Sequence, residues 1–149
     1  MASVFELGAF AELIDRIQKL PPSAGRQWGK MNVSQMLEHV SRAVEMAMGR
    51  GKQQQRLLGR LLGWAFKAKF VGNEPVPRNS PTGPDFIVTG EPEFEATKAR
   101  LLGLVRELHA MGESGCDGHV HLFFGRMSGA EWGATQYKHL DHHLRQFGG

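Results

Sequence analysis

Three histidines lie close together near the C-terminal end of the sequence, between Ser128 and Phe147. On a helix, residues four apart have Cβ atoms about 5–6 Å apart, so the imidazoles of His139 and His143 can converge on one metal ion. The adjacent residues His142 and His143 cannot, and His142 lies opposite the apolar stripe of this helix. Two histidines at this spacing are also typical of solvated side chains on a polar helix. The pair alone therefore leaves both interpretations open.

The helix that carries this pair has a predicted start and end. Ser128 and Glu131 form a capping-box pattern, in which each side chain accepts a hydrogen bond from a backbone N–H of the first turn. Gly148 is a natural C-terminal stop. The apolar stripe that would face a core consists of Tyr137, Leu140, Leu144 and Phe147.

Three further segments have the apolar period of long helices. The first extends from Val4 to Leu20, with Leu7 on its apolar face, and ends at two prolines. The second begins at Asn32, which has Gln35 three residues later, and ends near Gly49. The third extends from Pro92 to Met111. Four amphipathic helices predict an all-α fold, a four-helix bundle.

The second helix contributes His39, which lies roughly 100° from the middle of its apolar face. A lone histidine at such a position is more often a partly buried polar side chain than a ligand. Carboxylate di-iron chemistry is excluded, because no glutamate has a histidine three residues later. A mononuclear site built from His39, His139 and His143 remains.

Three neutral imidazoles leave coordination positions open, as in catalytic zinc sites. An ion held in this way could lower the pKa of a bound water toward about 7 or orient an incoming thiolate. Gln35, Gln136 and Tyr137 are candidates for groups that hydrogen-bond to the ligands, and spacing does not choose among them. The residues do not identify a general base, so the catalytic residues stay unassigned.

Two segments between the second and third long helices differ from the rest of the chain. Residues 50–70 contain six lysines and arginines and no acid, and Leu57, Leu58 and Leu61 mark one helical side. We expect a short basic helix that covers the bundle with its charges in water. Residues 71–90 contain four prolines and three glycines and predict a long ordered loop that could fold over a site. Residues 112–127 predict an extended connection without a partner strand.

The composition is that of a globular protein with one domain, residues 1–149: 41% of the residues are hydrophobic and 22% are charged. The only cysteine, Cys116, cannot form an internal disulfide, which fits a reducing compartment. The sequence has no signal-peptide pattern and no apolar run long enough for a membrane span, so we expect a cytoplasmic protein. The formal net charge is +3, and the positive charge is concentrated in residues 50–70.

This charge distribution raises alternatives to an enzyme. A non-catalytic helical module could use residues 50–70 to contact a protein partner or a membrane surface, with the histidines retained as polar packing. Nucleic acid is a weaker candidate partner, because the positive charge is confined to one segment and no motif for reading bases is present.

The motifs together resemble those of a known superfamily. MLEHV around His39 and KHLDHHLRQFG from Lys138 to Gly148 are similar to the DinB/YfiT-like superfamily of metal-dependent enzymes. With HLFFGRMSGAEW from His121 to Trp132, the chain resembles a DinB-related bacterial family of unassigned function. The similarity extends from about Lys30 to Gly148.

This resemblance implies an up-down-down-up four-helix bundle that holds one metal ion through His39, His139 and His143. It also implies zinc or nickel as the cofactor and a small-molecule substrate, such as a low-molecular-weight thiol. Better-understood relatives are thiol transferases or isomerases, and relatives often form homodimers. From the resemblance and the open coordination positions together, we expect a metal-dependent thiol (S-)transferase or hydrolase. The basic segment and the proline-rich loop depart from the superfamily pattern.

Overall fold

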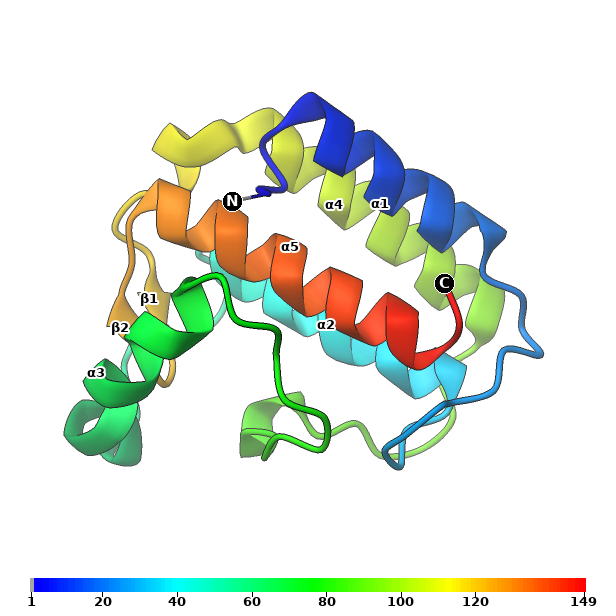
Figure 1. Ribbon diagram of the computed structural model, residues 1–149, viewed down its shortest axis with the longest axis horizontal. Coiled ribbons are helices and arrows are strands. Elements are labelled where there is room, and N and C mark those ends of the chain that lie inside the picture. The colour runs from blue at the N-terminus through cyan, green and yellow to red at the C-terminus, as the bar shows by residue number, and fades with distance from the viewer. Residues whose placement is uncertain (1) are drawn as a thin grey trace.

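The computed structural model describes residues 2–149, which are mostly helical (Figure 1). This part of the chain contains five α-helices, one 3₁₀ turn and a two-stranded sheet. In chain order these are α1 (Leu7–Lys19), α2 (Val33–Ala47), α3 (Leu57–Val71), η1 (Pro84–Phe86), α4 (Phe94–Cys116), β1 (Val120–His121), β2 (Gly125–Arg126) and α5 (Gly129–Gln146). The fold is therefore all-α in the broad sense that the sequence predicts.

Four of the helices pack on one another around a shared apolar core. Helix α4 contacts α1, α2 and α5, and α5 also contacts α1 and α2. Figure 1 shows α1 beside α4, and α5 beside α2. Both α2 and α5 have side chains in the core, including Met36, Val40, Leu140 and Leu144, which are almost completely buried. This packing fixes the relative positions of the two helices that carry the candidate ligands.

Both ligand-bearing helices begin with the predicted capping boxes. The Asn32 side chain accepts a hydrogen bond from the backbone N–H of Gln35 at 2.8 Å, and the Gln35 side chain accepts one from the N–H of Asn32 at 3.0 Å. Ser128 and Glu131 form the same reciprocal pair at the start of α5. These caps satisfy backbone donors that the first helical turn leaves without partners. The starts of α2 and α5 are thus confirmed.

The bounds of two other helices differ from the prediction. Helix α1 begins at Leu7 instead of Val4, because the backbone N–H of Val4 donates to the carbonyl of Gly133 on α5. Leu7 was predicted on the apolar face but is 74% exposed. Helix α4 continues past the predicted end at Met111, although Gly112 interrupts it with a φ of 66°.

The connection before α5 forms a small hairpin, which the sequence analysis did not predict. Val120 pairs with Arg126 and His121 with Gly125 in an antiparallel register. The expectation of a strand without a partner was wrong, since each strand has only two residues and gives almost no alternating pattern. The hairpin supports α3 and brings His121 toward the candidate metal site.

The orientation of α3 also corrects the prediction. Residues 50–56 are not helical, and the leucines of α3 do not cover the core. Gly59 and Gly63 instead face the hairpin, where a Cβ atom at either position would collide with the backbone carbonyl of Phe123. Because the two glycines occupy the protein side, the leucine side points outward.

We expect Gly63→Ala to displace α3 from the hairpin and to lower the free energy of unfolding by about 1–3 kcal/mol, the usual cost of overpacking. Gly103→Ala on α4 is a matched control, since open space surrounds that glycine and alanine favours a helix. Urea denaturation of both variants measures the difference. Equal stability of the two variants would contradict the close packing of α3 on Phe123.

Candidate metal centre

The three predicted ligands lie together between α2 and α5. His39 comes from α2, and His139 and His143 come from successive turns of α5. Each imidazole has a ring nitrogen within 4.8 Å of a ring nitrogen on both of the others. The Nε2 atoms of His39 and His139 are 3.1 Å apart. The three histidines could therefore bind one metal ion.

The separation of these nitrogens fits a common ligand geometry. Two imidazole nitrogens bound to one tetrahedral zinc ion at about 2.0–2.1 Å lie roughly 3.3 Å apart. The Nε2 atoms of His39 and His139 are already close to this separation. The ring centroid of His143 lies 4.7 Å from those of both His39 and His139. His143 has a ring nitrogen within 4.8 Å of both other ligand nitrogens, so it can supply the third nitrogen of such a site.

A backbone carbonyl fixes the orientation of His39. The Nδ1 atom of His39 lies 2.9 Å from the carbonyl oxygen of Phe86, in the 3₁₀ turn η1. Because a carbonyl can only accept, Nδ1 carries the proton and donates it, and Nε2 keeps its lone pair. That lone pair faces His139. The proline-rich loop thus folds over the site and selects the tautomer that a metal ligand needs.

A glutamine fixes His143 in the same way. The Nδ1 atom of His143 lies 2.8 Å from Oε1 of Gln146, and Nε2 of Gln146 donates to the carbonyl of Trp28 at 2.8 Å. The Trp28 carbonyl determines which end of the amide faces His143, so Oε1 is the acceptor and Nδ1 is the donor. The Nε2 lone pair of His143 is therefore free for a metal ion.

We expect Gln146→Leu to weaken zinc binding by about 10–100-fold, the usual cost of losing an orienting partner. Gln146→Glu keeps an acceptor for His143 but loses the donor to the Trp28 carbonyl, so its affinity should lie between those of the leucine variant and the wild-type protein. Competition with a chromogenic chelator measures both, and the unfolding midpoints of the apo proteins report any loss of folding. Wild-type affinity in the leucine variant would contradict the orienting role of Gln146.

Burial keeps all three imidazoles neutral. Loss of hydration lowers the pKa of His39 and lowers that of His143 to about 3. The pKa of His139 is well below its usual value because of burial, and the neighbouring His143 and His39 lower it further. A metal ion binds the neutral form of histidine, so these shifts leave the ligands ready to bind.

Two buried oxygen atoms on α5 lack hydrogen-bond partners. Thr135 and Gln136 precede His139 by about one helical turn, and both residues are 2% exposed. The Oγ1 atom of Thr135 and the Oε1 atom of Gln136 have no hydrogen-bond partner within the described residues. Buried polar groups nearly always have partners, so atoms of this kind suggest a place for a bound molecule. The two residues lie one turn before His139 on α5 and are outside the group of three converging imidazoles.

A fourth histidine lies near the cluster. The Nδ1 atom of His121 accepts hydrogen bonds from the backbone N–H groups of Phe123 and Phe124, at 3.0 and 3.1 Å. Burial lowers its pKa to about 4, so the ring is neutral and carries its proton on Nε2. The ring lies against Trp132, two turns before His139 on α5. His121 thus supplies a fixed N–H donor near the histidine cluster.

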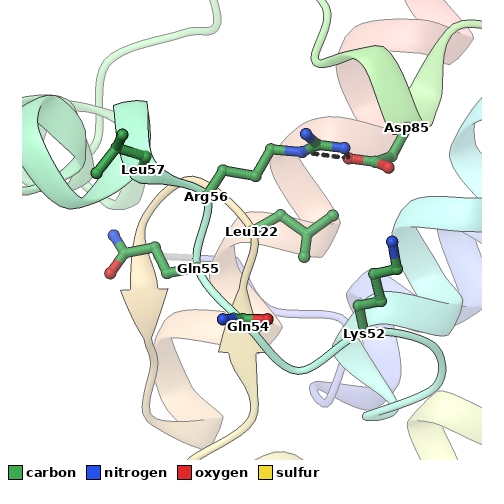
Figure 2. Close-up of a pocket in the computed structure, with 7 residues that line it drawn as sticks. All are labelled: Lys52, Gln54, Gln55, Arg56, Leu57, Asp85 and Leu122. Atoms are coloured by element: carbon green, nitrogen blue, oxygen red, sulfur yellow. Dashed lines mark hydrogen bonds and ion pairs between the residues drawn. The ribbon is translucent and has the colours of Figure 1, made fainter.

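A recess of about 300 Å³ lies between the start of α3, η1 and the hairpin, and none of the three histidines lines it. Figure 2 shows Arg56 and Asp85 pointing toward each other across it, with Lys52 and Leu122 on its walls. The Nε atom of Arg56 donates to Asp85 at 2.6 Å. Asp85 is adjacent to Phe86, which holds His39. The same 3₁₀ turn therefore lines the recess and contacts a candidate ligand.

Two of the other residues selected from the sequence do not contact the three histidines. The side chain of Gln35 caps α2 and donates to the carbonyl of Gly90. The hydroxyl of Tyr137 donates to Glu12 on α1, so neither residue orients a ligand. His142 was expected on the surface but is half-buried beside Trp28. His142 is nevertheless outside the group of three converging imidazoles.

The sequence analysis missed the groups that orient the ligands. Gln146 could have been found, because it follows His143 by three residues and so lies on the same side of the helix. Phe86 contributes only a backbone carbonyl from an irregular loop, and its residue type gives no signal. His121 lies in residues 112–127, for which the sequence predicted only an extended connection and no contact with the histidines. Apart from Gln146, only the ligands themselves had a recognisable spacing.

Comparison with known protein families identifies one match. The family model described as "Protein of unknown function (DUF1569)" matches residues 4–148. The chain belongs to this family. None of the curated proteins and none of the solved structures matches the chain. Members of the DUF1569 family thus have no function assigned by the family description, and the chemistry of this chain must be argued from its own residues.

Proposed function

We propose that the protein is a mononuclear metal-dependent enzyme that acts on a small molecule, as a thiol (S-)transferase or a hydrolase. The observation that carries this proposal is the convergence of His39, His139 and His143, with the first and last held in the ligand tautomer by Phe86 and Gln146. Solvated histidines would not need such partners. Zinc and nickel are the ions we favour, since imidazole nitrogen suits both.

The metal ion would act as a Lewis acid, lowering the pKa of a bound water toward about 7 or holding a thiol as its thiolate. Three protein ligands agree with this role, because closed structural zinc sites usually have four. His139 keeps part of its surface exposed, while His39 and His143 are buried. The exposed part of the centre is therefore on the His139 side.

The surrounding residues suit the binding of a polar molecule on that side. His121 offers an N–H donor. Thr135 and Gln136 hold buried oxygen atoms without hydrogen-bond partners among the described residues, one turn before His139. Because the pKa of His121 is about 4, this donor stays neutral at physiological pH and positions a substrate oxygen or sulfur without adding charge. The recess lined by Arg56 and Asp85 is the approach that we propose for the substrate.

We include the remaining inferences from the DinB resemblance in this proposal. They are an up-down-down-up four-helix bundle as a single domain, a low-molecular-weight thiol as substrate and a homodimer. The contacts of α1, α2, α4 and α5 agree with such a bundle. The single cysteine agrees with a cytoplasmic location, where thiol chemistry is common. Among residues 2–149, no helix combines the length and the apolar character required to cross a bilayer.

Cobalt substitution tests the proposed chemistry, because a thiolate bound to Co²⁺ gives an intense charge-transfer band. We would add a low-molecular-weight thiol to the cobalt-loaded protein, record the absorption spectrum and then assay transfer to an electrophile and ester hydrolysis. A charge-transfer band with transfer activity supports the transferase. Hydrolysis without the band supports the hydrolase. Loss of both in His39→Ala is expected, and neither signal in the loaded wild-type protein would contradict the proposal.

A further inference from the structure

Helix α3 has one side formed by glycines and an opposite side formed by leucines. Gly59 and Gly63 form the side that lies against Phe123. On a helical projection, the direction of Leu61 is roughly 180° from the middle of the glycine side. Helix α3 therefore uses its glycines, with Phe66 and Phe70, to contact the hairpin, and it directs its leucines away from the protein.

The outward side is unusually apolar for a protein surface. Five large side chains on this side of α3 are between 46% and 76% exposed: Leu57, Leu58, Leu61, Leu62 and Trp64. Phe66 lies on the glycine side, with its ring beside that of Phe123. Single exposed apolar residues are ordinary, whereas a contiguous patch of several hundred Å² marks an interaction surface. We call this surface the α3 patch. Leu7, 74% exposed on α1, is a large apolar side chain outside the α3 patch.

All charged side chains of α3 are positive. No acidic residue occurs from Arg50 to Phe70. Arg60 lies on one flank of the apolar arc, roughly 100° from Leu61. Lys69 lies within the arc, roughly 80° from Leu61, in the last turn of α3. Lys69 makes only a long, exposed ion pair with Glu74, at 3.9 Å. Arg60 has no ion-pair partner among the described residues.

Other cations near α3 are occupied within the protein. Arg56 pairs with Asp85, and Lys67 pairs with Glu131 on α5. These pairs attach the two ends of α3 to η1 and α5, so the helix is held with its outward side fixed. Within residues 2–149, Arg60 and Lys52 make no ion pair, and Lys69 makes only the long one with Glu74. These side chains can bend toward an interface.

We propose that the α3 patch binds the surface of an anionic membrane, with α3 parallel to the bilayer. The leucines and Trp64 would enter the boundary between head groups and acyl chains, and Arg60 and Lys69 would contact lipid phosphates. A second copy of this chain fits less well: a two-fold contact through this side would place one cationic, acid-free helix face against another. Charge complementarity favours the membrane.

Vesicle sedimentation of the full chain tests this inference. Vesicles of phosphatidylcholine mixed with phosphatidylglycerol should bind the protein, and vesicles of phosphatidylcholine alone should bind it much less. Trp64 fluorescence should shift to shorter wavelength on binding, and Trp64→Phe should remove that shift. Added salt should weaken binding, because it screens the attraction between Arg60, Lys69 and the lipid.

The variants compare matched exposed leucines. Leu61→Ser is expected to weaken binding to the mixed vesicles by about tenfold, since it removes one buried apolar side chain. Leu7→Ser should leave binding unchanged. Both positions are exposed, and circular dichroism checks that each variant folds. Equal binding to both kinds of vesicle, no binding to either, or a stable dimer that Leu61→Ser dissociates would overturn the proposal.

Discussion

Replacing His139 and His143 together with alanine is expected to abolish specific metal binding. Protein purified without a histidine tag and loaded with zinc should hold about one ion per chain, and the double variant should hold almost none after desalting. Removal of a ligand costs more affinity than removal of an orienting partner, which already costs about 10–100-fold. We therefore expect a loss of more than a hundredfold for each single variant. Inductively coupled plasma mass spectrometry and chelator competition measure these effects.

His142→Ala is the matched control for this experiment. It removes an imidazole from the same turn of α5, adjacent to a ligand, but His142 is outside the converging group. Its metal content should equal that of the wild-type protein. If the double variant retained wild-type metal content, the ion would be held elsewhere and the proposed centre would be wrong.

The metal-free protein is expected to lose stability as the pH falls below about 6.5. The pKa of His143 is about 3 in the folded protein, against 6.5 for an ordinary histidine, and burial also lowers the pKa of His39 and His139. Between a pH of about 3 and 6.5, His143 binds a proton in the unfolded chain but not in the folded protein. His143 therefore removes up to about 1.4 kcal/mol of unfolding free energy per pH unit, and His39 and His139 add a loss in the same direction. This stability is complete only above pH 6.5.

Urea denaturation of the chelator-treated protein between pH 7 and 5 measures this slope. His143→Leu removes one titrating group while keeping an apolar side chain of similar size. Its slope should be smaller than that of the wild-type protein by about 1.4 kcal/mol per pH unit. A flat profile for the wild-type protein would mean that the imidazoles accept protons in the folded state, contrary to their burial.

The ligands could be predicted from the sequence because they follow helix geometry. His139 and His143 are one turn apart, and a capping box at Ser128 places their helix correctly. The pairing with His39 needed a fold in which α2 and α5 are neighbours, and the resemblance supplied that expectation. The Phe86 carbonyl could not be predicted, because a backbone atom in an irregular loop has no residue-specific signal.

The direction of α3 shows a second limit of sequence reasoning. The spacing of Leu57, Leu58 and Leu61 correctly indicated a common side, but periodicity does not say whether that side faces the core. The two glycines decided the orientation, since only they allow close approach to the Phe123 backbone. The leucine side of α3 is therefore exposed to solvent, although the sequence predicted that it would cover the bundle.

The most direct test of the metal centre is a crystal structure of the zinc-loaded, tag-free protein with anomalous diffraction data. The geometry predicts one anomalous peak between α2 and α5, about 2.0–2.1 Å from Nε2 of His39, His139 and His143, with Phe86 and Gln146 still hydrogen-bonded to Nδ1 of their partners. A peak at another site, with the three imidazoles not bound to the ion, would contradict the account.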